Sequence, residues 1–161
     1  QKCGGQVIRG SENDVVDRFY QAAKLSQATH IVRICADNPL ICPEAIDDLI
    51  YFYQVNPCDY AYNHIPKNNC YPDGIGAEIV SFELLEEIDQ KASKPLQRTH
   101  VFNYIWEHEK HYNIKTFDPS DAQIRRPKIK LDVDSYKDYE NLLSKPIKIH
   151  MKTLEILPYF Q

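Results

Sequence analysis

The sequence predicts an α/β protein, a three-layer α/β/α sandwich around a mixed, mostly parallel sheet. Short apolar segments rich in β-branched residues alternate along the chain with amphipathic segments of about 10 to 15 residues, which is the pattern of strands separated by helices. Acidic and turn-forming residues follow two of the apolar segments, as they do where strands end at a ligand-binding edge. A length of 161 residues with 43% hydrophobic residues suits one core. We therefore predict a single domain over residues 1–161.

The first elements are an expected helix and a buried strand. Ser11 and Asp14 have the spacing of a capping box, and the apolar residues that follow share one face of a helix over about residues 12–25. Residues 29–35 form a short apolar and β-branched segment, as in strands buried in parallel sheets. We expect this strand to end immediately before Asp37.

The middle of the chain repeats the order of helix and strand. Pro43 suits the first turn of a helix that continues over residues 44–53. A short aromatic strand is expected over residues 59–63. Proline, asparagine and glycine then dominate residues 65–76 and predict a loop. Residues 78–81 return to an extended conformation.

The second half is expected to hold three helices and one strand. Ser81 is suited to cap the first of these helices, and residues 101–109 form the second. Charged and apolar residues alternate over 128–133, which predicts a strand. Ser135 and Asp138 then have capping-box spacing and open the last helix.

Composition excludes several classes of partner. A net charge of −4 gives no general attraction for nucleic acid, and the basic residues within 125–130 are interpreted as a solvated strand face. No segment reaches the roughly 18 consecutive apolar residues of a membrane helix, and none resembles a signal peptide. The five cysteines are dispersed and lack a Cys-x-x-Cys pair, so we expect reduced thiols. We predict a cytoplasmic protein without nucleic-acid or membrane partners.

Two aspartates point to a metal site. Asp37 and Asp134 each lie where an apolar strand is expected to end and a helix to begin. Ligands bind at the carboxyl ends of strands in open α/β sheets, so acids from distant parts of the chain can converge there. Mg²⁺ binds through one or two carboxylates and leaves its other positions to water and phosphates. The pair therefore predicts Mg²⁺-dependent chemistry on a nucleoside triphosphate.

Each aspartate also has a simpler explanation. Asp37 could be a turn former before Asn38 and Pro39, and Asp134 an ordinary residue ahead of a helix. Asp132 and Asp134 together form an Asp-Val-Asp sequence, which could equally indicate a glycosyltransferase that holds a sugar nucleotide through a metal.

Five segments in chain order carry a resemblance to a known family. They are residues 9–23, 32–41, 71–78, 98–101 and 131–138. The chain resembles cytidylyltransferases of the spore coat polysaccharide biosynthesis type (SpsF), relatives of the CMP-Kdo and CMP-sialic acid synthetases. The resemblance implies the nucleotide-diphospho-sugar transferase fold, which is GT-A-like and Rossmann-like. It also implies transfer of CMP from CTP to a sugar or sugar acid with release of pyrophosphate, for cell-surface or spore-coat polysaccharide synthesis.

The resemblance also assigns roles to residues. It makes Asp37 and Asp134 the catalytic metal pair, with Mg²⁺ as the cofactor. The nucleotide side of the site would be formed by Ser11, Asp14 and Arg18, although Asp14 could instead cap a helix. The sugar side would be formed by Asp73, Glu78, Arg98 and His100, although Asp73 could belong simply to a tight turn. Because relatives tend to be dimers, a homodimer is expected.

The sequence departs from the family in two places. Gly76 and Thr99 stand where the family tends to carry acids, so the acceptor sugar is expected to differ from better-known ones. Relatives also open with a strand and a glycine-rich, basic loop that grips the CTP phosphates, and residues 1–10 do not match it. We therefore expect an N-terminally truncated domain that lacks its first strands and is inactive alone. The alternatives are a non-catalytic interaction module or inert fragment, and a metal-dependent GT-A glycosyltransferase.

Overall fold

The computed structural model describes residues 4–148 and 150–160. The chain forms two compact units, and strands β1 and β3 pass from one to the other. Unit 1 consists of Gln1–Ile31 with Val80–Ile114, and unit 2 of Val32–Ile79 with Lys115–Gln161. The chain therefore leaves unit 1 within β1, returns within β3 and leaves it again at β4, so neither unit is a continuous segment.

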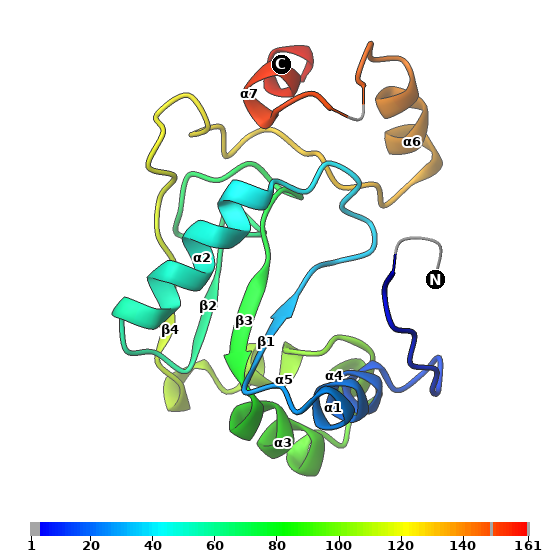
Figure 1. The fold of residues 1–161 in the computed structure, drawn as a ribbon, viewed down its shortest axis with the longest axis vertical. Helices are drawn as coiled ribbons and strands as arrows, with labels where there is room; N and C mark the ends of the chain where they lie inside the picture. The colour runs from blue at the N-terminus through cyan, green and yellow to red at the C-terminus, as the bar shows by residue number, and fades with distance from the viewer. Residues whose placement is uncertain (1–3, 149, 161) are drawn as a thin grey trace. The chain divides into compact units, whose positions relative to one another are not determined.

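A mixed four-stranded sheet carries the fold. Its strands are β1 (His30–Arg33), β2 (Tyr60–Tyr62), β3 (Glu78–Ser81) and β4 (Ile114–Lys115), in the order β1-β3-β2-β4. The Phe82 amide donates to the Thr29 carbonyl at 2.9 Å, and the Asn63 amide donates to the Ala77 carbonyl at 3.1 Å. These bonds make β3 antiparallel to both neighbours, as its arrow shows (Figure 1). A mixed sheet with flanking helices confirms the predicted α/β class. The sheet is not mostly parallel as expected, because β3 lies antiparallel between β1 and β2.

The helices of unit 1 pack mainly on one another. They are α1 (Val15–Ser26), α3 (Phe82–Lys91), α4 (Pro95–Thr99), α5 (Asn103–Glu107) and the 3-10 turn Glu109–His111. Helix α1 contacts both α3 and α4. It buries Val16 and Ala23, while α3 buries Leu84, Leu85 and Ile88, so the apolar faces recognised in the sequence do form the core of this unit.

The N-terminal caps decide where these helices begin. The Ser81 hydroxyl accepts the Leu84 amide at 3.2 Å, so α3 is capped as predicted. Helix α1 begins three residues later than expected, because the Asp14 carboxylate caps it by accepting the Asp17 amide at 3.0 Å. Ser11 instead accepts the amide of Asn13 at 3.2 Å, in a turn before the helix.

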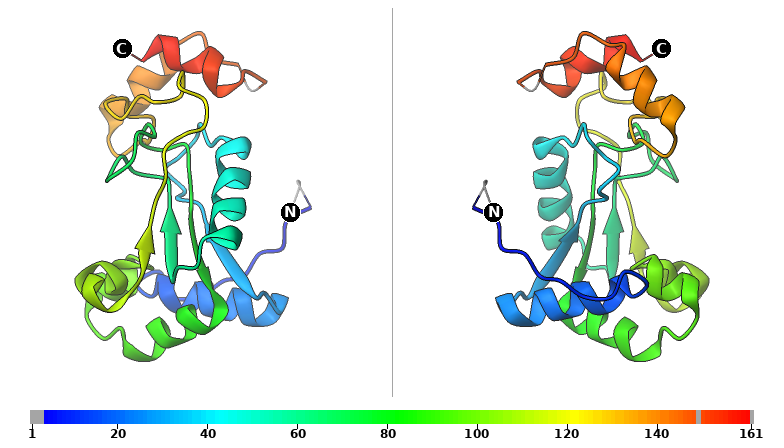
Figure 2. Two further views of the ribbon diagram at one scale, coloured as in Figure 1. Left: turned by 90° about the vertical axis from the view of Figure 1, so that its left-hand side faces the viewer. Right: turned by 90° about the vertical axis from the view of Figure 1, so that its right-hand side faces the viewer.

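Unit 2 is built around helix α2 (Pro43–Val55), which lies along β2 (Figures 1 and 2). Two groups of buried apolar residues form its core. One joins α2 to the strands through Leu49, Ala61, Ala77 and Ile79. The other gathers residues of the later loops around the start of α2 and consists of Cys42, Ala45, Tyr71, Ile75, Leu131 and Leu157. The remaining elements of the unit are α6 (Tyr136–Leu143), α7 (Thr153–Ile156) and the 3-10 turn Leu157–Tyr159.

The prediction of a strand over residues 128–133 is wrong. Only Lys130 pairs there, in a single parallel bridge with Asp73. The partner segment turns at Gly74, whose φ is +90°, so the pairing cannot extend into a ladder. The capping box that follows is confirmed, since Ser135 and Asp138 exchange both side-chain bonds and open α6. In the part of the chain that the structure describes, no helix has the length and apolar character needed to cross a membrane.

Candidate active site

Asp37 and Asp134 are brought to one region of unit 2. Asp37 lies in the exposed loop after β1, and its carbonyl accepts the Val133 amide at 2.8 Å. Val133 is the residue before Asp134, so this bond joins the two predicted metal-binding segments. The convergence that the sequence predicted therefore occurs, while the metal role of the pair stays a prediction.

The Asp73 loop is fastened to the same segment. The Asp73 amide donates to the Ile129 carbonyl at 2.9 Å, and the Asp73 carbonyl accepts the Leu131 amide at 3.0 Å. A Cβ atom on Gly74 would lie 2.6 Å from the Asp132 amide nitrogen. A side chain at this position would thus push the two backbones apart. Asp73 is both part of a tight turn and a neighbour of the predicted metal pair.

Four acids therefore form a carboxylate cluster, which we define as Asp37, Asp73, Asp132 and Asp134. Burial and the negative charges of the other three members raise the pKa of Asp73 to about 6, although the nearby Lys130 ammonium acts in the opposite direction. Burial also raises the pKa of Asp132. Near neutral pH the cluster is a dense accumulation of negative charge that favours a cation.

Lys130 supplies one cation to this region. Its ammonium lies 2.9 Å from Asp134, 3.1 Å from Asp138 and 3.3 Å from Asp132. The hydrogen bond from Lys130 is the largest cause of the lowered pKa of Asp134, and it raises the pKa of Lys130 in turn. Lys130 thus neutralises part of the carboxylate cluster, whereas no hydrogen bond or ion pair reaches the Asp73 side chain from the described residues.

The donor set suits a hard divalent cation. Within residues 4–148 and 150–160, no three His, Cys, Asp or Glu side chains are grouped so that they could hold a metal ion. Mg²⁺ does not require such a group, since it commonly takes one or two carboxylates and completes its shell with water and phosphate oxygens. One oxygen of Asp132, Oδ1, is buried without a hydrogen-bond partner among these residues, and the side chain of Asp134 is 60% exposed. The residues present therefore fit Mg²⁺.

Glu78, the first residue of β3, is part of a buried group of polar side chains. Its side chain is only 3% exposed and accepts hydrogen bonds from Arg33 and Tyr60. The Nε2 atom of His64 lies 3.8 Å from Glu78 Oε1, and burial lowers the pKa of this histidine. A sugar contact by Glu78 stays a prediction, because its oxygens already hold Arg33 and Tyr60. Sequence reasoning missed these partners, although a charged Arg33 between apolar strand residues was a visible signal.

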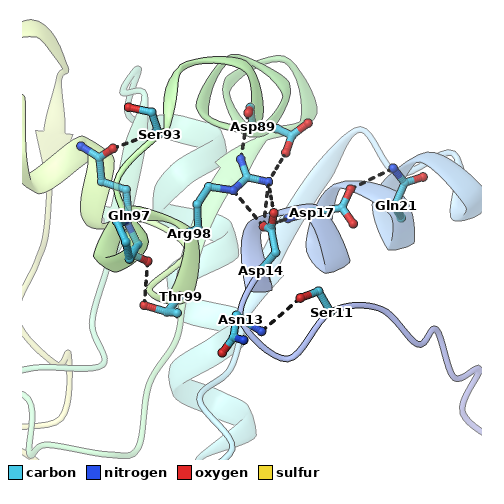
Figure 3. A network of polar contacts seen from close by, with 11 residues as sticks. Ser11, Asn13, Asp14, Asp17, Gln21, Asp89, Ser93, Gln97, Arg98 and Thr99 are labelled. Atoms are coloured by element: carbon cyan, nitrogen blue, oxygen red, sulfur yellow. Dashed lines mark hydrogen bonds and ion pairs between the residues drawn. The ribbon is translucent and has the colours of Figure 1, made fainter.

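Arg98 and Asp14 are partners of one another within unit 1 (Figure 3). Arg98 donates from Nε and Nη2 to the two Asp14 oxygens at 2.9 and 2.8 Å. It also donates to the Asp89 carbonyl and carboxylate, both at 2.8 Å. Burial alone would raise the pKa of Asp14, but the hydrogen bonds from Arg98 and from the Asp17 amide lower it. This network joins α1, α3 and α4, and the predicted ligand contacts of both residues stay predictions.

The other predicted contacts of unit 1 are Ser11, His100 and Arg18. Ser11 and His100 are exposed, and His100 follows the last turn of α4. Arg18 packs its aliphatic part against Gly10, and its Nε atom is buried without a hydrogen-bond partner among the described residues. An unsatisfied guanidinium nitrogen suits an anion, so the predicted nucleotide contact of Arg18 is physically reasonable.

The packing around Gly76 explains why this position carries no side chain, where the resemblance led us to expect an acid. Any Cβ atom at this position would collide with the backbone and side-chain oxygens of Asn63. Asn63 is fully buried, donates to the Ala45 carbonyl at 2.7 Å and accepts the Ala77 amide at 2.9 Å. An acid at position 76 would therefore displace a satisfied buried amide, which costs stability.

Comparisons with known proteins show which family the chain is similar to. A family model described as cytidylyltransferase matches residues 1–155. The Spore coat polysaccharide biosynthesis protein SpsF of Bacillus subtilis is 33% identical over 142 residues, which cover 88% of this chain and 57% of that protein. The uncharacterized protein MJ1063 of Methanocaldococcus jannaschii is 36% identical over 137 residues, covering 85% of this chain and 54% of that protein.

A solved structure shows the same likeness. A cytidylyltransferase from Leptospira borgpetersenii superposes with a TM-score of 0.75 at 30% identity, over 88% of this chain and 58% of that one. The chain thus spans little more than half the length of the curated relatives it matches. The family match covers nearly the whole chain, and the chain belongs to the cytidylyltransferase family.

Proposed function

We propose that this protein transfers CMP from CTP to a sugar or sugar acid, with release of pyrophosphate, in a Mg²⁺-dependent step of cell-surface polysaccharide synthesis. Membership of the family supports the reaction, and the likeness to SpsF of Bacillus subtilis supports the pathway. The observation that carries the proposal is the hydrogen bond between the Asp37 and Val133 backbones, because it brings Asp37 beside Asp134. We further propose a cytoplasmic protein and a homodimer, of which the homodimer is supported by the resemblance.

The residues of the carboxylate cluster would divide the work. Asp37 and Asp134 would hold Mg²⁺, which neutralises charge on the phosphates when it is bound. Asp73 lies beside them with a pKa of about 6 and can either accept or donate a hydrogen bond near neutral pH. It is therefore suited to orient a sugar hydroxyl toward the α-phosphate.

Acceptor-dependent pyrophosphate release tests this proposal. The full-length gene product is given CTP and Mg²⁺ with a panel of sugar acids and neutral sugars, and pyrophosphate and CMP-sugar are measured together. We expect both products in equal amounts with at least one acceptor, and much lower release with ATP or UTP. Release of pyrophosphate without a CMP-sugar, or no release with any acceptor, contradicts the proposal.

The same assay separates the rival functions. A glycosyltransferase that uses Asp132 and Asp134 would consume a preformed sugar nucleotide in preference to CTP. A non-catalytic module would bind CTP and Mg²⁺ only weakly in calorimetry, with dissociation constants in roughly the millimolar range or above. The buried and unpartnered Oδ1 atom of Asp132 is the one observation that favours the glycosyltransferase.

A further inference from the structure

Lys130 is the one basic residue with ion pairs to the carboxylate cluster in the part of the chain that the structure describes. Its ammonium is shared by Asp132 and Asp134 of the cluster and by Asp138, at distances between 2.9 and 3.3 Å. Three carboxylates within this range of one ammonium are held together against their mutual repulsion. Without such a cation, these acids would repel one another.

The backbone of Lys130 is fixed, whereas its side chain is not. The parallel bridge to Asp73 and the bonds of Ile129 and Leu131 to the same residue hold the backbone in place. The Lys130 side chain is 44% exposed and that of Asp134 is 60% exposed, so the ammonium can leave without unpacking the core. It remains tethered within the length of one side chain.

The ammonium and a divalent cation compete for the same oxygens. Asp134 is the predicted metal ligand, and Lys130 lies 2.9 Å from its Oδ2 atom. A divalent cation bound to Asp134 would lie close to the ammonium, and two positive charges at such short range repel each other. Occupation by the metal therefore requires that the ammonium withdraw from Asp134.

We propose that Lys130 is the built-in counter-cation of the carboxylate cluster: its ammonium holds Asp132 and Asp134 in place in the metal-free protein, and a divalent cation binds by displacing it. The inference rests on the metal role of Asp134 in the proposed function. Lys130 is thus a positioning residue that weakens metal binding, because each binding event must break its ion pairs.

Mn²⁺ binding to the full-length protein tests the inference without any need for turnover. Free Mn²⁺ is followed by its electron paramagnetic resonance signal, in the absence of nucleotide and Mg²⁺. Lys130→Met is expected to bind Mn²⁺ roughly three- to tenfold more tightly than wild type, since the competing ion pairs are gone. Lys130→Arg keeps the cation and is expected to retain the wild-type affinity.

Lys128→Met is the matched control. Lys128 is exposed, lies two residues away and has no ion pair with the described residues, and its replacement changes the net charge equally. We expect its Mn²⁺ affinity to equal that of wild type, and Asp134→Asn to bind Mn²⁺ at least roughly tenfold more weakly. If Lys130→Met does not fold, Lys130→Gln is titrated with the same expectations.

Equal or weaker Mn²⁺ binding by Lys130→Met overturns the inference, and so does an equal gain in Lys128→Met, which would show a general charge effect. The proposed function is judged separately, by CMP-sugar formation. A gain in Mn²⁺ affinity without any CMP transfer would support the role of Lys130 and contradict the proposed cytidylyltransferase function. CMP transfer by the wild type, with an unchanged Mn²⁺ affinity in Lys130→Met, would support the proposed function and contradict the role of Lys130.

Discussion

At the scale of single residues, Asp73 shows that gathering acids at the candidate site lowers the stability of the folded protein. Its carboxyl group is partly buried among Asp37, Asp132 and Asp134, and this setting raises its pKa from 3.8 to about 6. A raised pKa means that the folded protein binds this proton more tightly than the unfolded chain does. Between these two pH values, the free energy of unfolding must fall as the pH rises.

We therefore expect Asp73→Asn to stabilise the metal-free protein at pH 7.5. The gain should be about 1–3 kcal/mol, because the charged form of Asp73 no longer has to be buried beside other acids. At pH 4, where Asp73 is protonated in the folded state, the substitution should be nearly neutral. Urea unfolding at both pH values, with EDTA present, measures the difference.

Asp47→Asn is the control for this pair of measurements. Asp47 is exposed on α2, so its replacement should leave stability nearly unchanged at both pH values. A loss of stability in Asp73→Asn that is the same at pH 4 and pH 7.5 would contradict the electrostatic explanation.

At the scale of elements, the Arg98 network shows how α1, α3 and α4 are joined. Arg98 makes four hydrogen bonds to Asp14 and Asp89, which lie at the start of α1 and near the end of α3. The Arg98 side chain is mostly buried, so these bonds are better shielded from water than surface ion pairs.

We expect Arg98→Met to lower the free energy of unfolding by about 2 kcal/mol, since it leaves two carboxylates without their partner. Lys91→Met is a suitable control, because Lys91 makes an exposed pair with Glu87 and should cost less than about 0.5 kcal/mol. Thermal and urea unfolding measure both. A cost for Arg98→Met no larger than that of the control would show that the network does not hold the helices together.

The elements also show what a sequence can and cannot predict. Caps made by side chains close in sequence, such as Ser81 and the Ser135–Asp138 box, were predicted because their partners lie within one turn. The strand expected at 128–133 failed, because pairing depends on the distant turn at Gly74. Elements as short as α4 and β4 were not predicted, since a few residues carry little propensity.

In the candidate site, too, some residues could be predicted from the sequence and others could not. Asp37 and Asp134 were singled out because each was expected to follow a strand, which holds for Asp37 and not for Asp134, and Asp73 was singled out by the family resemblance. The partners Lys130, Arg33 and His64 were not found. Local sequence does not show which acid a basic side chain will contact, even where a charged residue such as Arg33 stands out between apolar ones. Local sequence and the family resemblance thus point to the acids, and only the tertiary structure shows which side chains neutralise them.

At the scale of the whole molecule, the chain belongs to the cytidylyltransferase family and spans little more than half of its curated relatives. The activity that we propose for the full-length protein depends on whether the carboxylate cluster acts as a metal site. The backbone contacts of Asp37 and Asp73 hold the cluster together before any ligand arrives. These contacts would preorganise the proposed metal site, as expected for positioning and electrostatic catalysis.

The most direct test of the account is CMP-sugar formation from CTP and Mg²⁺ by the full-length wild type, Asp37→Asn, Asp134→Asn and the control Asp47→Asn. The account predicts that each of the first two variants loses turnover by roughly a hundredfold or more, while Asp47→Asn behaves as wild type. Unchanged turnover in Asp37→Asn or Asp134→Asn, with Mg²⁺ as the only divalent cation, would contradict it.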